Sequence, residues 1–400
     1  MGLIPLGERP APSTPPSGWA PFALGFRPFF ALAGLSGLIL MVLWIGFWHA
    51  GKAPPSAYFT TIDWHSHEML FGFTLAIIAG FLLTAVRNWT GIDTPTGKPL
   101  ALLALLWLLA RLLPFVPSIP SWLVALTDLL FIPALIYALY TPLTRAENRI
   151  NRLFLPLLAA MALANLLYHL QGLGVTSTGP RGLTLMLNLI LLLLIFVGGR
   201  VLPFFTEKAV NGAAPRFNKQ REQFVYAVFI LWTLGELLLP QSGLLFPLAF
   251  GVAATQAWRL ADWYHPGIWR RPILWVLFSG LFWLSLGYFL KGLALLELFP
   301  ANLAIHALTA GAIGVFTLGM MARVALGHTG REIEPSRLIT ITFILINLAV
   351  IIRVFLPVTG LLGYETCIDL SGSLWALCYL LFVLTYLPIL ARPRIDGRPG

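Results

Sequence analysis

Long apolar segments alternate with short polar breaks along almost the whole chain. Each segment holds about 20 residues, the length that a helix needs to cross roughly 30 Å of hydrocarbon. The segments lack the alternation of a barrel strand, so the pattern predicts an all-α integral membrane protein. The twelve predicted spans are 28–50, 66–86, 98–116, 122–144, 150–174, 181–204, 223–241, 244–262, 271–293, 301–325, 335–357 and 367–391.

The composition leaves little room for anything except a membrane domain. Of the 400 residues, 58% are hydrophobic and 10% are charged, whereas about a quarter of an ordinary soluble domain is charged. We therefore predict one polytopic domain over 28–391, between an N-terminal tail, 1–27, and a C-terminal tail, 392–400. The first tail holds Pro10, Pro12, Pro15 and Pro16 and no apolar core of a signal peptide, so we expect it to be retained and disordered.

Basic residues gather in every second connecting loop. Examples are Arg87 with Lys98, Arg270 with Arg271, and Arg331 with Arg337. Because Lys and Arg near helix ends stay on the cytoplasmic side, we place both termini in the cytoplasm and predict an even number of spans. The net charge of +10 then reflects topology and contact with anionic lipid, and we predict no nucleic-acid partner.

Five of the seven histidines fall in the outer, periplasmic half of their predicted spans: His49, His65, His67, His169 and His306. The other two, His265 and His328, fall on the cytoplasmic side. A single membrane histidine is often a packing residue, but several in one leaflet indicate a functional site. Neutral imidazole suits haem iron, copper or zinc, and the scarcity of buried carboxylates argues against a carboxylate-bridged di-iron centre.

His65 and His67 are two residues apart, so on a regular helix they point about 200° away from each other. Either His65 lies in a non-helical entry turn, or the two imidazoles serve different sites, such as a haem and a second metal. Glu68 follows directly. It would orient an imidazole, bind a metal, carry protons, or simply interact with the positive end of its helix.

Small residues follow His306 along one helix face, at Ala310, Gly314 and Thr317. This strip would make a groove for a flat macrocycle, although close helix packing explains small residues equally well. His328 lies 22 residues, roughly 33 Å, beyond His306 on a continuous helix and belongs to a separate site. That site would hold a second haem or a copper ion, or His328 would only cap the helix end.

Arg200 and Arg323 end their helices in a similar way. In each case valine follows directly, and threonine lies six residues after the arginine. These arginines would clamp haem propionates or anchor the helices at the interface. Together with a looser match near Arg87, they hint at three pseudo-repeated four-helix units.

Five further charges fall inside predicted spans: Arg111, Asp128, Glu236, Arg353 and Asp369. We expect pairing among them, since an unpaired charge in a span is costly. Cys367 and Cys378 are eleven residues, roughly 16 Å, apart on one predicted helix, which is too far for a disulfide.

Several stretches of the chain resemble the NnrS family. They are 64–73 (WHSHEMLFGF), 25–30 (GFRPFF), 199–206 (GRVLPFFT), 306–314 (HALTAGAIG) and 327–331 (GHTGR). The resemblance implies a haem- and copper-containing protein of the bacterial inner membrane that is linked to nitric oxide metabolism and to resistance to nitrosative stress. It further implies that the family's prominent histidines are His65, His67, His306 and His328, with His169 as another.

The architecture also resembles, distantly, the haem-copper oxidases and nitric oxide reductases. The histidine ligands that those enzymes carry on their sixth and seventh helices are missing here, because 183–205 and 224–240 contain none. A conventional copper or non-haem iron centre at that place is therefore not expected.

The leading functional hypothesis is a haem-dependent protein that binds nitric oxide and reduces it to nitrous oxide. It would hold more than one haem b, with copper as a further cofactor, and take electrons from quinol or a periplasmic redox protein. Glu68 or Glu236 would carry protons. The alternatives are a metal-handling or proton-coupled transporter, and a haem-based sensor or sink that binds nitric oxide without turnover.

Overall fold

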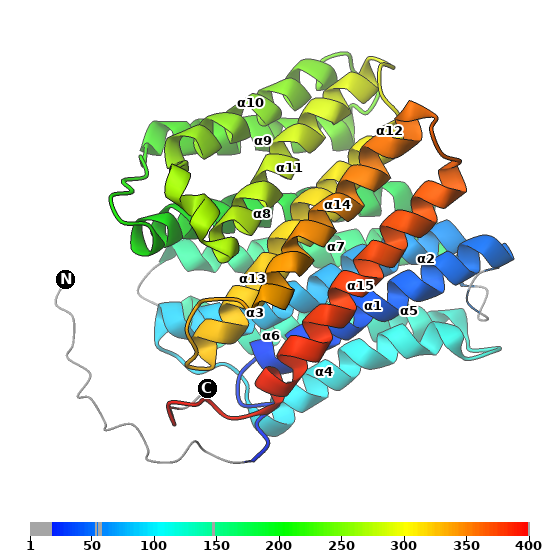
Figure 1. The fold of residues 1–400 in the computed structure, drawn as a ribbon. Coiled ribbons are helices and arrows are strands. Elements are labelled where there is room, and N and C mark those ends of the chain that lie inside the picture. The colour runs from blue at the N-terminus through cyan, green and yellow to red at the C-terminus, as the bar shows by residue number, and fades with distance from the viewer. Residues whose placement is uncertain (1–17, 53, 55–57, 146–148, 399–400) are drawn as a thin grey trace.

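The computed structural model describes residues 18–52, 54, 58–145 and 149–398, and every element in that part of the chain is a helix (Figure 1). The prolines of the predicted N-terminal tail lie outside the described residues. The first half of the chain forms α1 (Phe26–Ala50), α2 (Thr61–His67), η1 (Glu68–Thr74), α3 (Leu75–Thr90), α4 (Gly97–Leu112), η2 (Leu113–Phe115), α5 (Ser121–Leu129), α6 (Phe131–Arg145), η3 (Arg149–Leu153), α7 (Phe154–Gly172) and α8 (Gly179–Ala209). The second half forms α9 (Lys219–Leu238), α10 (Leu245–Trp263), η4 (Pro266–Arg270), α11 (Pro272–Leu295), α12 (Ala301–His306), η5 (Ala307–Val315), α13 (Phe316–His328), α14 (Arg337–Thr359) and α15 (Tyr364–Ala391).

Ten helical segments of the described chain are long and apolar enough to cross a membrane. The all-helical multi-pass architecture is therefore confirmed, whereas the count of twelve and the threefold repeat stay predictions. Among the described long helices, α9 and α10 fall short; α9 packs against α8 and α10, and α10 packs against α11. They carry charges that are neutralised within the bundle: Arg221 and Arg259 pair with Glu222, and Arg221 also pairs with Asp262.

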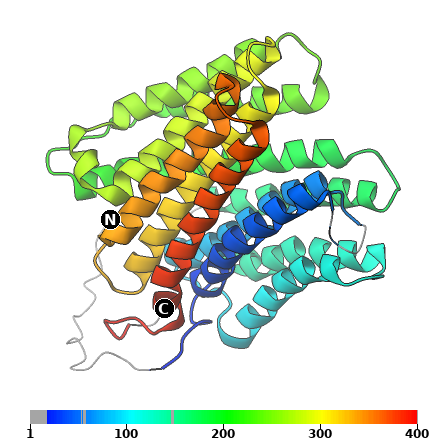
Figure 2. The same cartoon turned by 45° about the vertical axis from the view of Figure 1, so that its right-hand side comes forward.

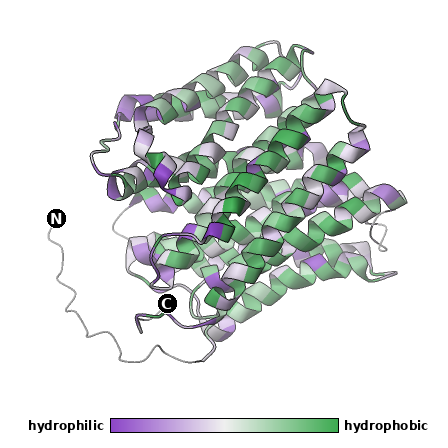
Figure 3. Cartoon of the chain, viewed as in Figure 1, coloured by the Kyte–Doolittle hydropathy of each residue, from purple (hydrophilic) through white to green (hydrophobic). Residues whose placement is uncertain are grey.

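The helices run roughly side by side, with α1 packed against α15 and α3, and α11 against α10 and α13 (Figures 1 and 2). Apolar residues cover most of their length, and the hydrophilic residues gather mainly near helix ends (Figure 3). The amide of Ala20 donates to the carbonyl of Ala391 at 2.8 Å. Both ends of the membrane domain therefore lie on one side of the bundle, which we call the terminal end.

The five histidines that were expected in one leaflet lie together at the opposite end of the bundle, the histidine end. His49 pairs with Asp369 at 2.8 Å, and the ring of His65 stacks on Trp44 with centroids 4.2 Å apart. The rings of His67 and His169 are 5.1 Å apart. His328 lies at the terminal end, where its carbonyl accepts from Arg394 at 2.9 Å.

In the described part of the chain, two helical segments have the wider turn of a π-helix, η1 and η5. Each continues a short α-helix that ends in a histidine, His67 before η1 and His306 before η5. A π-turn shifts the side chains that follow it around the helix axis, and such segments are frequent at functional sites. Nothing in the hydrophobic pattern distinguished these turns from ordinary α-helix.

Cys367 and Cys378 are both buried and both free, as their spacing predicted.

Candidate metal centre and histidine cavity

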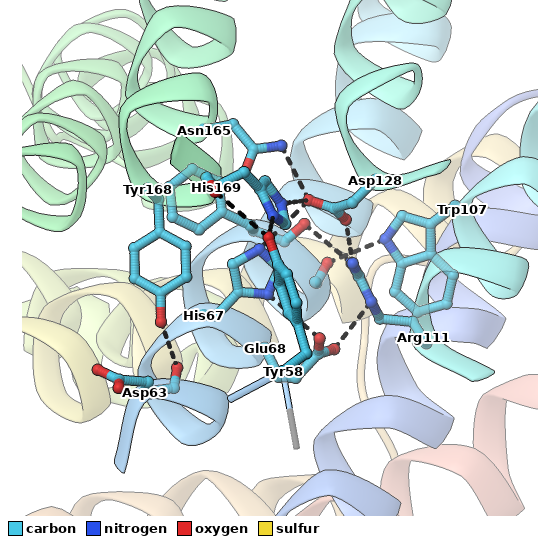
Figure 4. Close-up of polar contacts among 12 residues, drawn as sticks. Tyr58, Asp63, His67, Glu68, Trp107, Arg111, Asp128, Asn165, Tyr168 and His169 are labelled. Carbon is cyan, nitrogen blue, oxygen red and sulfur yellow. Dashed lines mark hydrogen bonds and ion pairs between the residues drawn. The ribbon is translucent and has the colours of Figure 1, made fainter. Parts of the chain in front are cut away.

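His65 and His67 lie on α2 and face two different sites. His65 is part of the helix, so the explanation by a non-helical entry turn is wrong. Its ring stacks on Trp44 of α1 and lines a cavity that it shares with His306. The ring of His67 points to the other side of α2, into a closed cluster between η1, α4, α5 and α7 (Figure 4).

In that cluster, His67, Asp128 and His169 converge. The Oδ2 atom of Asp128 lies 3.2 Å from Nε2 of His67 and 2.9 Å from Nε2 of His169. The three ligand atoms lie within 4.8 Å of one another, and all three side chains are at least 95% buried. Two imidazole nitrogens and one carboxylate oxygen suit iron, copper or zinc. We call these three residues the metal centre.

Further side chains contact the other ring nitrogen, Nδ1, of the two imidazoles (Figure 4). Nδ1 of His67 lies 3.2 Å from Oε1 of Glu68, and the ionised carboxylate accepts a hydrogen bond from Nδ1–H. Nδ1 of His169 lies 2.8 Å from the Tyr58 hydroxyl, which also lies 3.4 Å from the carbonyl of His169. If Nδ1–H donates in both rings, both Nε2 atoms present lone pairs to Asp128. Carboxylate and tyrosine partners of this kind commonly fix the tautomer of a metal-binding histidine.

The charges of the cluster leave room for one more cation. Arg111 pairs with Asp128 and lies 2.8 Å from Glu68, and all three are buried. One guanidinium thus faces two carboxylates. Nε2 of His67 and Oε2 of Glu68 have no partner with hydrogen-bond geometry among the described residues. Because a buried charge is costly unless it is compensated, a proton or a metal ion is needed among these lone pairs.

The cavity beside the metal centre is lined by His65 and His306, from helices far apart in the sequence, and measures about 280 Å³. Nδ1 of His306 donates to the carbonyl of Asn302 at 2.7 Å. A carbonyl only accepts, so Nδ1 carries the proton and Nε2 keeps a free lone pair. Apolar side chains such as Phe73, Ile313 and Trp375 make up most of the remaining wall.

Glu236 and Lys291 line the same cavity and form an ion pair with each other. Asn188 donates to Oε2 of Glu236 at 2.8 Å, and the indole of Trp232 donates to Asn188 at 3.1 Å. This polar group connects α8, α9 and α11 at the edge of an otherwise apolar space. The cavity is therefore lined by a carboxylate and an amine in addition to the imidazoles of His65 and His306.

The small-residue strip after His306 is only partly open. Ala310 lines the cavity. A side chain at Gly314, however, would meet Trp375 within 2.5 Å, so at this position the close-packing explanation holds. On η1, Gly72 is likewise covered by Glu68 and Arg111.

The other predicted site residues fall into two places. Glu68 and His169 belong to the metal centre and its surroundings, as described above. Arg200, Arg323 and His328 line a separate cavity at the terminal end. Arg87 pairs instead with the exposed Asp93 at 2.8 Å.

Sequence reasoning missed Asp128 as a ligand, Arg111 and Asn165 as the partners of Asp128, and Tyr58 as the partner of His169. Asp128 and Arg111 were recognised only as intramembrane charges that should pair, which they do. Their pairing with each other was a usable signal, because both fall in the same half of neighbouring spans. Tyr58 precedes α2 and carried no signal at all.

Comparison with curated proteins finds no match for this chain. A family model, described as NnrS protein, matches residues 20–394, which is nearly the whole chain. Membership in that family suggests a membrane protein related to nitric oxide and associated with metal or haem binding, and the cluster of His67, Asp128 and His169 agrees with metal binding. The chain belongs to the NnrS family.

Proposed function

We propose that this protein is a haem-dependent protein of the bacterial inner membrane that binds nitric oxide and reduces it to nitrous oxide, thereby protecting against nitrosative stress. The observation that carries the proposal is the shared cavity of His65 and His306 beside the metal centre. Two imidazoles with free nitrogens face one largely apolar space, next to a second set of metal-binding side chains.

The residues of the cavity fit a haem. His65 and His306 are the side chains available to hold its iron, and a coordination position stays open for nitric oxide only if one of the two binds it. Its apolar body would lie against Phe73, Ile313 and Trp375. A bound haem supplies an iron that exchanges electrons and, where a coordination position is open, binds nitric oxide. Ala310 leaves space in the cavity beside His306, because its side chain is a single methyl group.

The reduction consumes protons as well as electrons: two molecules of nitric oxide, two electrons and two protons give one nitrous oxide and one water. Glu236 is the better placed of the two predicted proton carriers, because it lines the cavity while Glu68 is held by Arg111 and His67 in the metal centre. Lys291 beside it stabilises the ionised carboxylate between proton transfers.

The metal centre fits copper. Arg111 and a singly charged copper ion would together balance the carboxylates of Glu68 and Asp128. His67, Asp128 and His169 are almost entirely buried, so a molecule from solution cannot reach them without movement of the chain. We therefore propose that the metal centre stores an electron or holds α2 in position against its neighbouring helices. We place the binding of nitric oxide in the cavity. Electrons would come from quinol or from a periplasmic redox protein.

The test is an anaerobic spectrum of the purified protein, oxidised and then reduced with dithionite, with metal analysis, addition of nitric oxide and a nitrous oxide assay. We expect haem bands that shift with the gas, and formation of nitrous oxide. His306→Ala should remove a haem band, whereas His265→Ala, in a loop remote from the cavity, should not. A colourless protein would support metal or proton transport instead, and a shift without nitrous oxide would support a sensor or sink.

A further inference from the structure

A second large cavity lies at the terminal end of the bundle. It measures about 330 Å³ and is lined by the ends of α3, α8 and α13. Arg200, Arg323 and His328 come together in its wall, from helices that are separate in the sequence. The function proposed above makes no use of this cavity.

The cavity is positively charged. Its lining includes two guanidiniums and, among the described residues, no carboxylate. Arg200 donates to Asn151 at 3.1 Å and stacks on Trp89. Arg323 has only the ring of Phe205 as its partner within the described chain, with its guanidinium carbon 3.2 Å from the ring centroid. Two cations without an acid near the membrane interface indicate a ligand that carries two negative groups.

His328 adds a ligand atom to this charged wall. Its ring lies 5.7 Å from the ring of Phe26 and makes no hydrogen bond with the side chains or backbone that the structure describes. The backbone around it is held firmly, because Arg394 donates to the carbonyl of His328 and the amide of Ile395 donates to that of Thr329 at 3.1 Å. The ring nitrogens of His328 are therefore available to a ligand, on a backbone that the C-terminal tail holds in place.

The remaining wall suits a flat apolar body. Aromatic rings from Phe81, Trp89 and Phe204 line the cavity. A narrow apolar space of about 60 Å³ adjoins it, since Phe81 and Met320 line both. The site therefore combines aromatic walls, an imidazole and two guanidiniums, which match the ring, the iron and the two propionates of a haem.

We propose that this cavity is a second haem site, in which His328 would bind the iron and Arg200 and Arg323 would bind the propionates. The inference rests on the proposed function only in that it takes haem to be the protein's cofactor. It places the two haem sites at opposite ends of the membrane domain. An anionic phospholipid would satisfy the arginines but would leave the imidazole without a partner.

The experiment compares His328→Gly, Arg323→Gln, His306→Ala and the control His265→Ala in the purified full-length protein. Haem and lipid phosphate per polypeptide are measured, together with the reduced-minus-oxidised spectrum. We expect His328→Gly to retain about half of the haem, and added imidazole to restore the missing band, because it replaces the side chain that would bind the iron. A misfolded variant would not respond to imidazole. Arg323→Gln should lose the same band more readily on dilution.

Full haem content in His328→Gly and Arg323→Gln would overturn the inference, as would loss of lipid phosphate in Arg323→Gln with haem unchanged. Haem lost from His306→Ala but not from His328→Gly would leave the proposed function standing and remove only the second site. The reverse result would remove the assignment of His306 and keep the second site.

Discussion

Nε2 of His169 lies 2.9 Å from Oδ2 of Asp128, although 41 residues separate them in sequence. One residue is near the end of α7 and the other near the end of α5. Both side chains are buried, and His67 from a third helix contacts the same oxygen of Asp128. Helix packing thus brings the metal centre together, and its chemistry depends on the carboxylate of Asp128, which both imidazoles face.

Asp128→Asn should abolish metal binding and destabilise the protein. The amide removes the only charged ligand of the centre, and Arg111 loses one of its two carboxylate partners. Breaking a buried ion pair in this way typically costs about 3–5 kcal/mol. Metal per polypeptide and thermal unfolding in detergent would be measured against Asp93→Asn, whose carboxylate is 81% exposed. Wild-type metal content in Asp128→Asn would show that the ion is bound elsewhere.

Glu236→Gln should slow nitrous oxide formation and leave nitric oxide binding in place. The amide keeps the shape of the side chain and the contact with Asn188, but it no longer carries a proton. Loss of a positioned proton carrier typically lowers the rate by about 10²–10⁴-fold. Turnover and the nitric oxide spectrum would be recorded on the same preparation.

Two further variants make this prediction sharper. The double change Glu236→Gln with Lys291→Met should be as slow as the single one while removing the unpaired ammonium. Glu334→Gln, which alters an exposed pair with Arg271, should turn over like the wild type. Unchanged turnover in Glu236→Gln would exclude this residue as the proton carrier.

Gly199→Ala should destabilise the packing of α8 against α9 and α10. A methyl group at Gly199 would clash with Nη2 of Arg259. That guanidinium cannot move freely, because it is bonded to Glu222 at 2.8 Å and to the carbonyl of Ile195 at 3.1 Å. Overpacking of this kind costs about 1–3 kcal/mol. In a thermal unfolding assay, Gly46→Ala, which meets nothing within 4 Å, should unfold like the wild type.

The C-terminal tail should loosen in acid. Hydrogen bonds from Arg394, at 2.6 and 2.9 Å, lower the pKa of Asp396 from its ordinary 3.8 to about 2. Because the folded-state pKa is the lower one, this contribution to stability is fully present above the ordinary value and is lost as the pH falls through about 2. Carboxyl NMR titration of the solubilised protein measures the pKa directly.

The same contact can be removed at neutral pH. Asp396→Asn should let trypsin cut after Arg394 faster, since the guanidinium is released from the carboxylate that holds it beside the His328 loop. Asp93→Asn at a distant loop serves as the control. Equal cleavage rates at Arg394 in both variants would mean that the hydrogen bonds from Ile395 and from Arg394 to the backbone of the His328 loop hold the tail without Asp396.

The sequence by itself determined the class of the protein and the depth of its histidines. Continuous apolar runs lead to helices in a bilayer, because every backbone group in hydrocarbon needs a partner within its own segment. Helix order then assigns each residue to an end of the bundle. That is why His65, His169 and His306 were correctly expected at one end and His328 at the other. The family, too, was recognisable from the histidine motifs and their surroundings.

Only the tertiary structure decided which of these side chains meet. Spacing showed that His65 and His67 point apart, but the choice of His306 as the neighbour of one and Asp128 as the neighbour of the other depends on which helices pack together. In a membrane domain most helix faces are apolar, so the hydrophobic pattern says little about neighbours. The π-turns after His67 and His306 rotate the following residues around the helix axis, and the hydrophobic pattern does not distinguish such turns from ordinary α-helix.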